Sequence, residues 1–293
     1  MMMDQASRLR ELVSRNAAKN VTRSMEANNT RILAVASGKG GVGKSNLVVN
    51  LAVALAQQGK KVVVFDADLG MANIDILMGI VPRCNLYDVL YGRKELKEVV
   101  VKGPEGIEVI PGGSGIQELA NLSPERQEKL LNALQQLAAG ADYLLIDTGA
   151  GISRVVVAFL GAAQEVIIVA TPEPTSLTDA YGLIKILAKY GDHANIKTVI
   201  NRVTNRRDGE NTGEKLRMTA LRFLNLELET LGYIREDKYL VKAVKEQEPL
   251  LLKYPYAGAS EDIQILAGRL LQMKIDKPMG VQKFFHRLQR LFG

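Results

Sequence analysis

A glycine-rich octapeptide at residues 38–45, Gly-Lys-Gly-Gly-Val-Gly-Lys-Ser, constrains the fold of this chain more than any other feature. It fits the pattern G-x-x-x-x-G-K-[ST], in which backbone N–H groups turn inward around phosphate oxygens. The apolar run at residues 32–36 predicts a strand before the loop, and residues 44–58 predict a helix after it. A strand, this loop and a helix in succession predict a phosphate-binding loop at the end of an α/β sheet.

The alternation of strand and helix patterns continues along the chain. Further strands are predicted at residues 61–65, 107–110, 143–146, 166–170, 198–200 and 230–234, and further helices at 123–139, 152–163, 175–190, 213–226 and 256–273. Several of the strands are apolar on both faces, as expected when helices cover both sides of a parallel sheet. We therefore predict an α/β fold with a doubly wound, mostly parallel sheet flanked by helices.

Three parts of the chain differ in character. Residues 1–30 combine a short amphipathic stretch with an asparagine-rich linker, residues 31–273 form the α/β domain, and residues 274–293 hold a second linker and a short helix. The net charge of +6 lies at the two ends, since residues 1–31 carry +3 and residues 274–293 carry +4, which leaves −1 for the segment between them. Basic ends favour contact with an acidic partner, a nucleic acid or an anionic membrane.

Composition excludes several classes of protein. Apolar residues make up 47% and charged residues 24% of the 293 residues, which is typical of a chain with a sizeable globular core. The sequence lacks both an apolar run of about 18 residues and an apolar signal segment, so we expect a cytoplasmic protein. The single cysteine, Cys84, excludes an internal disulfide and a cluster held by several cysteines of one chain.

The loop supplies groups for binding a nucleoside triphosphate with Mg²⁺. Lys44 is expected to reach the β- and γ-phosphates, and Ser45 to ligate the metal ion. The start of the following helix adds partial positive charge near the phosphates. We expect contacts to the nucleotide from Gly38, Lys39, Gly40, Gly41, Val42, Gly43, Lys44 and Ser45.

Carboxylates follow two of the predicted strands. Asp66 and Asp68 come after the strand at residues 61–65, where the carboxyl ends of strands in open α/β sheets bind ligands. Asp147 ends the apolar run at residues 144–146, a pattern typical of the Walker B carboxylate that holds Mg²⁺ through water. These side chains are therefore candidates for the metal site, together with Ser45.

Lys39 places a second lysine in the loop. The sequence K-G-G-V-G-K-S resembles the deviant Walker A signature of the MinD/ParA family of P-loop ATPases. In that family the first lysine crosses a dimer interface and touches the nucleotide of the partner. The resemblance therefore implies a MinD-like fold, hydrolysis of ATP to ADP and phosphate by an ATP-bound homodimer, and a role for Lys39 in trans like that of an arginine finger.

The same resemblance implies roles for four further residues. Asp68 is implied to orient or activate the attacking water, as a catalytic residue beside Lys39 and Lys44. Asp66 is implied to support the Mg²⁺ shell. Asn201 is implied to recognise the adenine edge, with Arg202 next to it in the ATP/ADP site. In the loop that usually lies near the base, Arg235 stands where the family often has proline, which leaves the details of the base pocket open.

The last residues form a basic amphipathic pattern. Val281 and five further apolar residues recur at one-face helical spacing, while lysine and arginine occupy other positions; the side chains expected to contact a membrane are Phe284, Phe285, Leu288, Leu291 and Phe292. Such a helix at a chain end is typical of peripheral binding to an anionic membrane surface, and MinD proteins carry a helix of this type. The alternative is a helix that docks on the core of the protein itself. If the helix binds lipid, ATP-driven dimerisation would recruit the chain to the inner face of the cell membrane.

The first residues carry a second resemblance. Asp4-Gln5-Ala6-Ser7-Arg8-Leu9-Arg10 is similar to the D-Q-A-x-x-L-R element of the FlhG family (also called FleN or YlxH), MinD-like ATPases that control flagellar number and placement. In that family the element contacts FlhF, a GTPase related to those of the signal recognition particle, and stimulates GTP hydrolysis; Gln5 matches the residue with that role. The resemblance also implies flagellar switch-complex proteins or a flagellar transcription regulator as further partners.

Two other positioning functions use the same ATPase. A division-site ATPase of the MinD type usually begins close to its phosphate loop, so the element at residues 4–10 argues against it. A DNA-partition ATPase of the ParA type binds DNA through basic surface on its body. Because residues 32–273 carry a net charge of −1, direct DNA binding is disfavoured.

Overall fold

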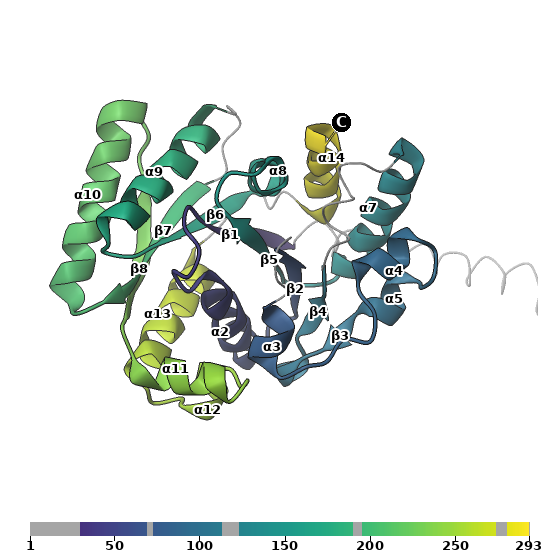
Figure 1. The fold of residues 1–293 in the computed structure, drawn as a ribbon, viewed down its shortest axis with the longest axis horizontal. Coiled ribbons are helices and arrows are strands. Elements are labelled where there is room, and N and C mark those ends of the chain that lie inside the picture. Colours follow the sequence, from purple (N-terminus) through teal and green to yellow (C-terminus); the bar gives the residue numbers. More distant parts are fainter. Residues whose placement is uncertain (1–29, 69–72, 113–122, 190–194, 274–279, 293) are drawn as a thin grey trace, which may run out of the picture.

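The computed structural model describes residues 30–68, 73–112, 123–189, 195–273 and 280–292. An eight-stranded sheet lies at the centre, with the strand order β3-β4-β2-β5-β1-β6-β7-β8 (Figure 1). Neighbouring strands run parallel except β3 and β4, so the predicted mostly parallel sheet is confirmed. The strands are β1 (Arg31–Ser37), β2 (Val62–Ala67), β3 (Val101–Lys102), β4 (Glu108–Ile110), β5 (Tyr143–Ala150), β6 (Glu165–Ala170), β7 (Asn195–Val203) and β8 (Glu229–Arg235).

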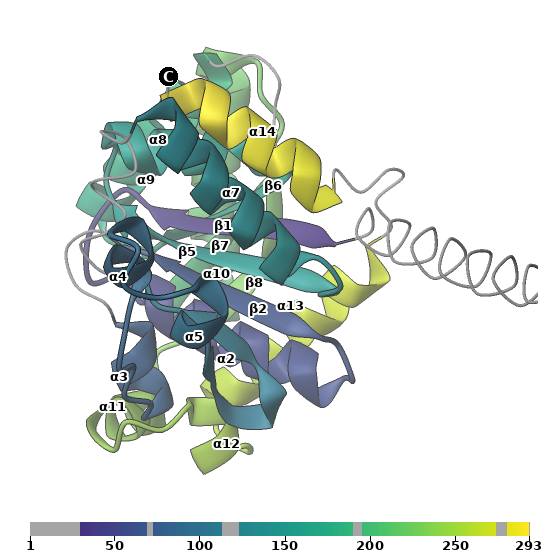
Figure 2. The same cartoon turned by 90° about the vertical axis from the view of Figure 1, so that its right-hand side faces the viewer.

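Helices cover both faces of the sheet and bury two separate apolar layers (Figure 2). One layer is built with α4 (Leu86–Leu90), α5 (Leu96–Val99), α7 (Pro124–Ala138), α8 (Arg154–Ala162), α9 (Pro174–Lys189), α10 (Arg206–Leu224) and α14 (Gly280–Phe292). The other is built with α2 (Lys44–Gln57), α3 (Ile74–Met78), α11 (Lys238–Lys245), α12 (Leu250–Lys253) and α13 (Gly258–Gln272). Because both faces are covered, the central strands are buried on each side, which explains their continuous apolar runs.

The predicted long helices are present, and the largest difference in their bounds lies in α10. This helix begins at Arg206 rather than residue 213, and the Asn205 side chain caps its start by accepting from the Asp208 N–H. Gly209 reads as a helix breaker in the sequence. In the structure it lies inside α10, where a Cβ would stand 2.6 Å from the ring of Tyr233. The close approach of α10 to β8 therefore requires glycine at this position.

The short helices α3, α4, α5, α11 and α12 and the strand β3 were not predicted. Four to eight residues, or two in β3, are too few to show a helical or strand period in the sequence. The predicted activator element with Gln5 and the linker at residues 16–29 lie outside the described residues, as does the linker at residues 274–279. In the part of the chain that is described, no helix combines the length and apolar character needed to cross a bilayer.

The helix at the end of the chain differs most from expectation. The apolar side chains expected to face lipid turn toward the protein in α14, where Phe284 and Leu288 have no exposed surface. They pack on α7 and α8, which lie beside α14 (Figure 2). Phe292 meets Phe159 of α8 edge to face, with ring centroids 6.0 Å apart. In this conformation α14 therefore takes the alternative arrangement, a helix docked on the core of the protein, because α7 and α8 supply an apolar groove that covers its apolar face. Contact of these side chains with a membrane stays a prediction.

Candidate functional site

The octapeptide connects β1 to α2 and passes over the carboxyl ends of the central strands. Gly43 lies before the first residue of α2 with φ +92°, a left-handed conformation that favours glycine. A Cβ at Gly43 would stand 2.3 Å from the Asn201 amide nitrogen, and one at Gly38 would stand 2.3 Å from the backbone of Asp179. The loop therefore packs tightly against β7 and α9, and both contacts require the absence of a side chain.

Lys44 brings the predicted polar groups together. Its Nζ donates to Asp147 Oδ1 at 2.5 Å, and both side chains are buried. The same nitrogen lies 4.0 Å from Asp68 Oδ2 and 3.4 Å from Ser45 Oγ. Residues far apart in the sequence thus form one polar cluster at the start of α2, as the sequence predicts.

The carboxylates of this cluster lie in a strongly desolvated place. Asp66 and Asp147 are register partners on the adjacent strands β2 and β5, and each is almost fully buried. Burial, and after it the charge of the neighbouring Asp147, raise the pKa of Asp66 to about 7, although hydrogen bonds from the Asp68 and Ile74 N–H groups act in the opposite direction. Burial also raises the pKa of Asp147, while Lys44 and Ser45 act in the opposite direction.

Asp147 also offers an acceptor to a ligand. Among the described residues, its Oδ2 is buried without a hydrogen-bond partner. Buried polar atoms are usually paired, so this oxygen marks a place where a cation or an ordered water fits. Ser45 Oγ lies at the same point, and hydroxyl and carboxylate oxygens are the ligand types that Mg²⁺ takes in nucleotide sites.

Lys39 is separate from this buried cluster. Its Nζ donates to Glu173 Oε2 at 2.9 Å and to Thr175 Oγ1 at 3.2 Å, on the segment that leads into α9. The side chains of Lys39 and Glu173 are 41% and 56% exposed, so solvent screens the pair and it contributes little stability. Nothing local in the sequence indicates Glu173 as a partner, since 134 residues separate it from Lys39.

Asn201 lies against the same loop from the other side. Its buried side chain donates to the Val42 carbonyl at 2.7 Å and accepts from the Arg202 N–H at 2.9 Å. Arg202 has φ +56°, an unusual conformation for a residue with a side chain. Arg235, at the end of β8, forms an ion pair with Asp262 at 2.7 Å. The predicted adenine-binding residue thus does lie at the phosphate loop.

A short segment connects this site to the docked helix α14. The Gly151 N–H donates to the Ser37 carbonyl, which precedes the octapeptide, at 2.9 Å. Two residues later, Ser153 caps α8 through the Val156 N–H. Arg154 then donates from Nη2 to the Phe292 carbonyl at 2.8 Å. Sequence reasoning missed Arg154, because its partner lies 138 residues away and no motif marks it.

Comparison with known proteins agrees with this site. A family model described as "AAA domain" matches residues 30–200, which include the octapeptide and Asp147. The chain is 40% identical over 261 residues to the antiactivator FleN of Pseudomonas aeruginosa, covering 87% of this chain and 91% of that protein. It is 36% identical over 299 residues to the flagellum site-determining protein YlxH of Helicobacter pylori, covering all of both chains.

The fold agrees with solved structures as well. The septum site-determining protein MinD of Pyrococcus horikoshii, in complex with Mg-ADP, superposes with a TM-score of 0.68 at 27% identity. The match covers 84% of this chain and 100% of that one. Both resemblances drawn from the sequence are therefore confirmed: the chain belongs to the FlhG (FleN/YlxH) group of the MinD/ParA family of P-loop ATPases.

Proposed function

We propose that this ATPase is a dimerising switch that regulates flagellar number or placement from the inner face of the cell membrane. The observation that carries the proposal is Lys39, which is exposed on the phosphate loop and held by a weak, solvent-screened pair. A lysine in this position is available to a second copy of the chain. The names of FleN and YlxH support the flagellar role.

Within one protomer, the polar cluster would bind and position ATP. In the absence of nucleotide, Lys44 neutralises the Asp147 carboxylate. When ATP binds, Lys44 would release Asp147 and bind the β- and γ-phosphates instead. Ser45 and Asp147 would hold Mg²⁺, with Asp66 behind them, and the metal ion would supply charge neutralisation at the phosphates. Asp68 would orient the attacking water, and Asn201 would bind the adenine edge.

Dimerisation would complete the site. Lys39 would leave Glu173 and reach the nucleotide of the partner, where its charge stabilises the transition state. Sedimentation velocity of the full chain with ATP and with ADP tests this directly, with Lys39→Ala as the variant. We expect dimers with ATP and monomers with ADP, and monomers in both for Lys39→Ala, which should still bind ATP. A variant that dimerises normally would refute the role of Lys39.

Membrane binding would require α14 to leave its groove. The helix carries basic residues on its outer side and an apolar face that is now buried, so undocking would expose a surface suited to anionic lipid. One short interfacial helix binds marginally, whereas two on an ATP-held dimer gain avidity of roughly 10²- to 10⁴-fold. The protein would thus be cytoplasmic as a monomer and peripheral on the membrane as a dimer.

The N-terminal element would act on a second protein. We expect Gln5 to stimulate a GTPase of the signal-recognition-particle type, in the manner of the FlhG family. A synthetic peptide of residues 1–20 added to the FlhF-type GTPase of the same cell should accelerate GTP hydrolysis, and a Gln5→Ala peptide should not. Equal rates of GTP hydrolysis with both peptides would refute a role for Gln5 in stimulating this GTPase, while the proposed ATPase activity would be unaffected. Flagellar switch-complex proteins or a transcription regulator are further candidates for binding to the domain.

A further inference from the structure

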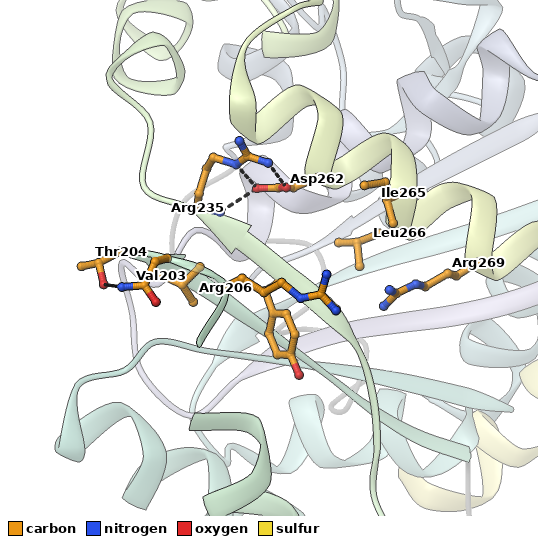
Figure 3. Close-up of a pocket in the computed structure, with 11 residues that line it drawn as sticks. Val203, Thr204, Arg206, Arg235, Asp262, Ile265, Leu266 and Arg269 are labelled. Carbon is orange, nitrogen blue, oxygen red and sulfur yellow. Dashed lines mark hydrogen bonds and ion pairs between the residues drawn. The ribbon is translucent and has the colours of Figure 1, made fainter. Parts of the chain in front are cut away.

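A groove with a volume of about 470 Å³ lies at an edge of the sheet (Figure 3). β8 is the last strand of the sheet, and α10 and α13 flank it. The lining includes none of residues 38–45, so the groove is separate from the phosphate loop. Its volume falls within the range of protein ligand sites, roughly 300–1,000 Å³.

Strand β8 and helix α13 approach each other closely along this β8 groove. A Cβ at Gly232 would stand 2.5 Å from Leu266 Cδ2 and 3.2 Å from Arg269 Nη1, so only glycine allows α13 to lie this close. On the other side the Tyr233 ring packs on Gly209 of α10. Glycine within a strand often marks a point where another backbone or a ligand approaches closely.

The outer polar groups of β8 point into the groove. The Arg235 N–H donates to Asp262 Oδ2 at 2.9 Å, and Arg269 Nη1 donates to the Leu231 carbonyl at 2.5 Å, so both backbone groups face away from β7. Backbone polar groups alternate in direction along a strand, so the N–H and C=O groups of Tyr233, two residues before Arg235, face outward as well. Asp262 and Arg269 already bond the Arg235 N–H and the Leu231 carbonyl, so Tyr233 between them supplies the backbone groups with which another strand can pair.

The charge of the groove is positive. Three arginines and one aspartate line it, and Asp262 is engaged by Arg235 through two hydrogen bonds of 2.7 and 2.8 Å. Arg206 and Arg269 extend their guanidinium groups toward each other across the groove (Figure 3), and both act electrostatically on Tyr233. Arg206 is bonded to Glu210 in an exposed i,i+4 pair, which is weak and easily exchanged for another carboxylate.

We propose that the β8 groove binds an extended acidic segment of a partner protein, which pairs with β8 as a further strand. The main chain of the segment pairs at Tyr233, its carboxylates meet Arg206 and Arg269, and an apolar side chain covers Ile265, which is 53% exposed. Charged side chains at a sheet edge discourage unspecific pairing, so the arginines select an acidic strand. The proposal does not depend on dimerisation, on α14 or on Gln5.

A labelled peptide tests the proposal on the full-length protein. A fluorescein-labelled octapeptide of alternating glutamate and valine should give a saturable rise in anisotropy, and its lysine–valine counterpart should not. Arg206→Gln and Arg269→Gln should each weaken binding roughly tenfold, because each removes a charge-assisted hydrogen bond. Arg217→Gln is the matched control, since Arg217 lies on α10, pairs with Glu214 at 2.8 Å and does not line the groove.

A second peptide separates strand pairing from simple charge attraction. Methylation of alternate backbone nitrogens blocks pairing without changing charge, and the methylated peptide should lose binding at least about tenfold. Equal binding of the methylated peptide overturns strand addition. Equal binding by the Arg206 and Arg269 variants, with unfolding temperatures matching the parent, overturns the site, as does the lack of saturable binding up to about 1 mM.

Discussion

Replacing Arg154 by alanine removes one hydrogen bond that holds α14 on the domain. The guanidinium donates to the Phe292 carbonyl at 2.8 Å, in the last turn of the helix. Hydrogen bonds from charged groups contribute about 1.5–3 kcal/mol, but Arg154 is exposed to solvent, so about 1 kcal/mol is the appropriate size. Such a loss raises the undocked fraction about fivefold, and apparent membrane affinity scales with that fraction.

Sedimentation with liposomes measures this effect. The nucleotide-free protein is mixed with vesicles containing anionic phosphatidylglycerol, and the bound fraction is followed against lipid concentration. Arg154→Ala should bind with about fivefold higher apparent affinity than the parent chain. Because Arg154 lies outside α14, the lipid-facing side chains of the helix remain unchanged.

Arg217→Ala controls for the lost positive charge, since Arg217 forms an exposed pair on α10. Truncation after residue 273 removes α14 and should abolish liposome binding, which would show that the binding depends on α14. Unchanged or weaker binding by Arg154→Ala, relative to the Arg217→Ala control, would refute the reasoning that docking limits access of α14 to the membrane.

Three further predictions concern the nucleotide site and the core. Asp68→Ala should bind ATP but hydrolyse it roughly 10²-fold more slowly in a phosphate-release assay, and a normal rate would remove Asp68 from catalysis. Folding raises the pKa of Asp66 from 3.8 to about 7 when no nucleotide is bound. Protonated Asp66 therefore makes its full contribution to the free energy of unfolding below pH 3.8, and this contribution is lost as the pH rises through about 7. The free energy of unfolding should therefore fall by roughly 3 kcal/mol more between pH 5 and 8 than that of Asp66→Asn; parallel curves would contradict the raised pKa. Phe284→Ala should lower the free energy of unfolding by about 3–5 kcal/mol in urea, because Phe284 is fully buried, and an unchanged midpoint would mean that α14 is not docked in solution.

The nucleotide site was predictable because its signals are local. The spacing of glycines and lysine at residues 38–45 describes a backbone shape and a charge together, and Asp147 stands directly after an apolar strand. Parallel strands bring their carboxyl ends to one edge, so the fold class places Lys44, Asp68 and Asp147 at the same edge of the sheet. The order of the strands and the contacts of each side chain did not follow.

The unpredicted features depend on pairs of distant segments. An amphipathic helix has the same pattern whether its apolar face meets lipid or a groove, and the groove for α14 is made by α7 and α8, more than a hundred residues earlier. The contact between Lys39 and Glu173 joins two segments whose proximity no hydrophobic pattern or motif in the sequence indicates. Only the assembled sheet brings such segments together.

Sedimentation of the Asp68→Ala chain with anionic liposomes measures how ATP is coupled to membrane binding. This variant should hold ATP without turning it over, so the ATP and ADP states can be compared under steady conditions. We expect binding at least about tenfold tighter with ATP than with ADP, and loss of that difference when Lys39→Ala is added. Equal binding with ATP and ADP would show that nucleotide does not control access of this chain to the membrane.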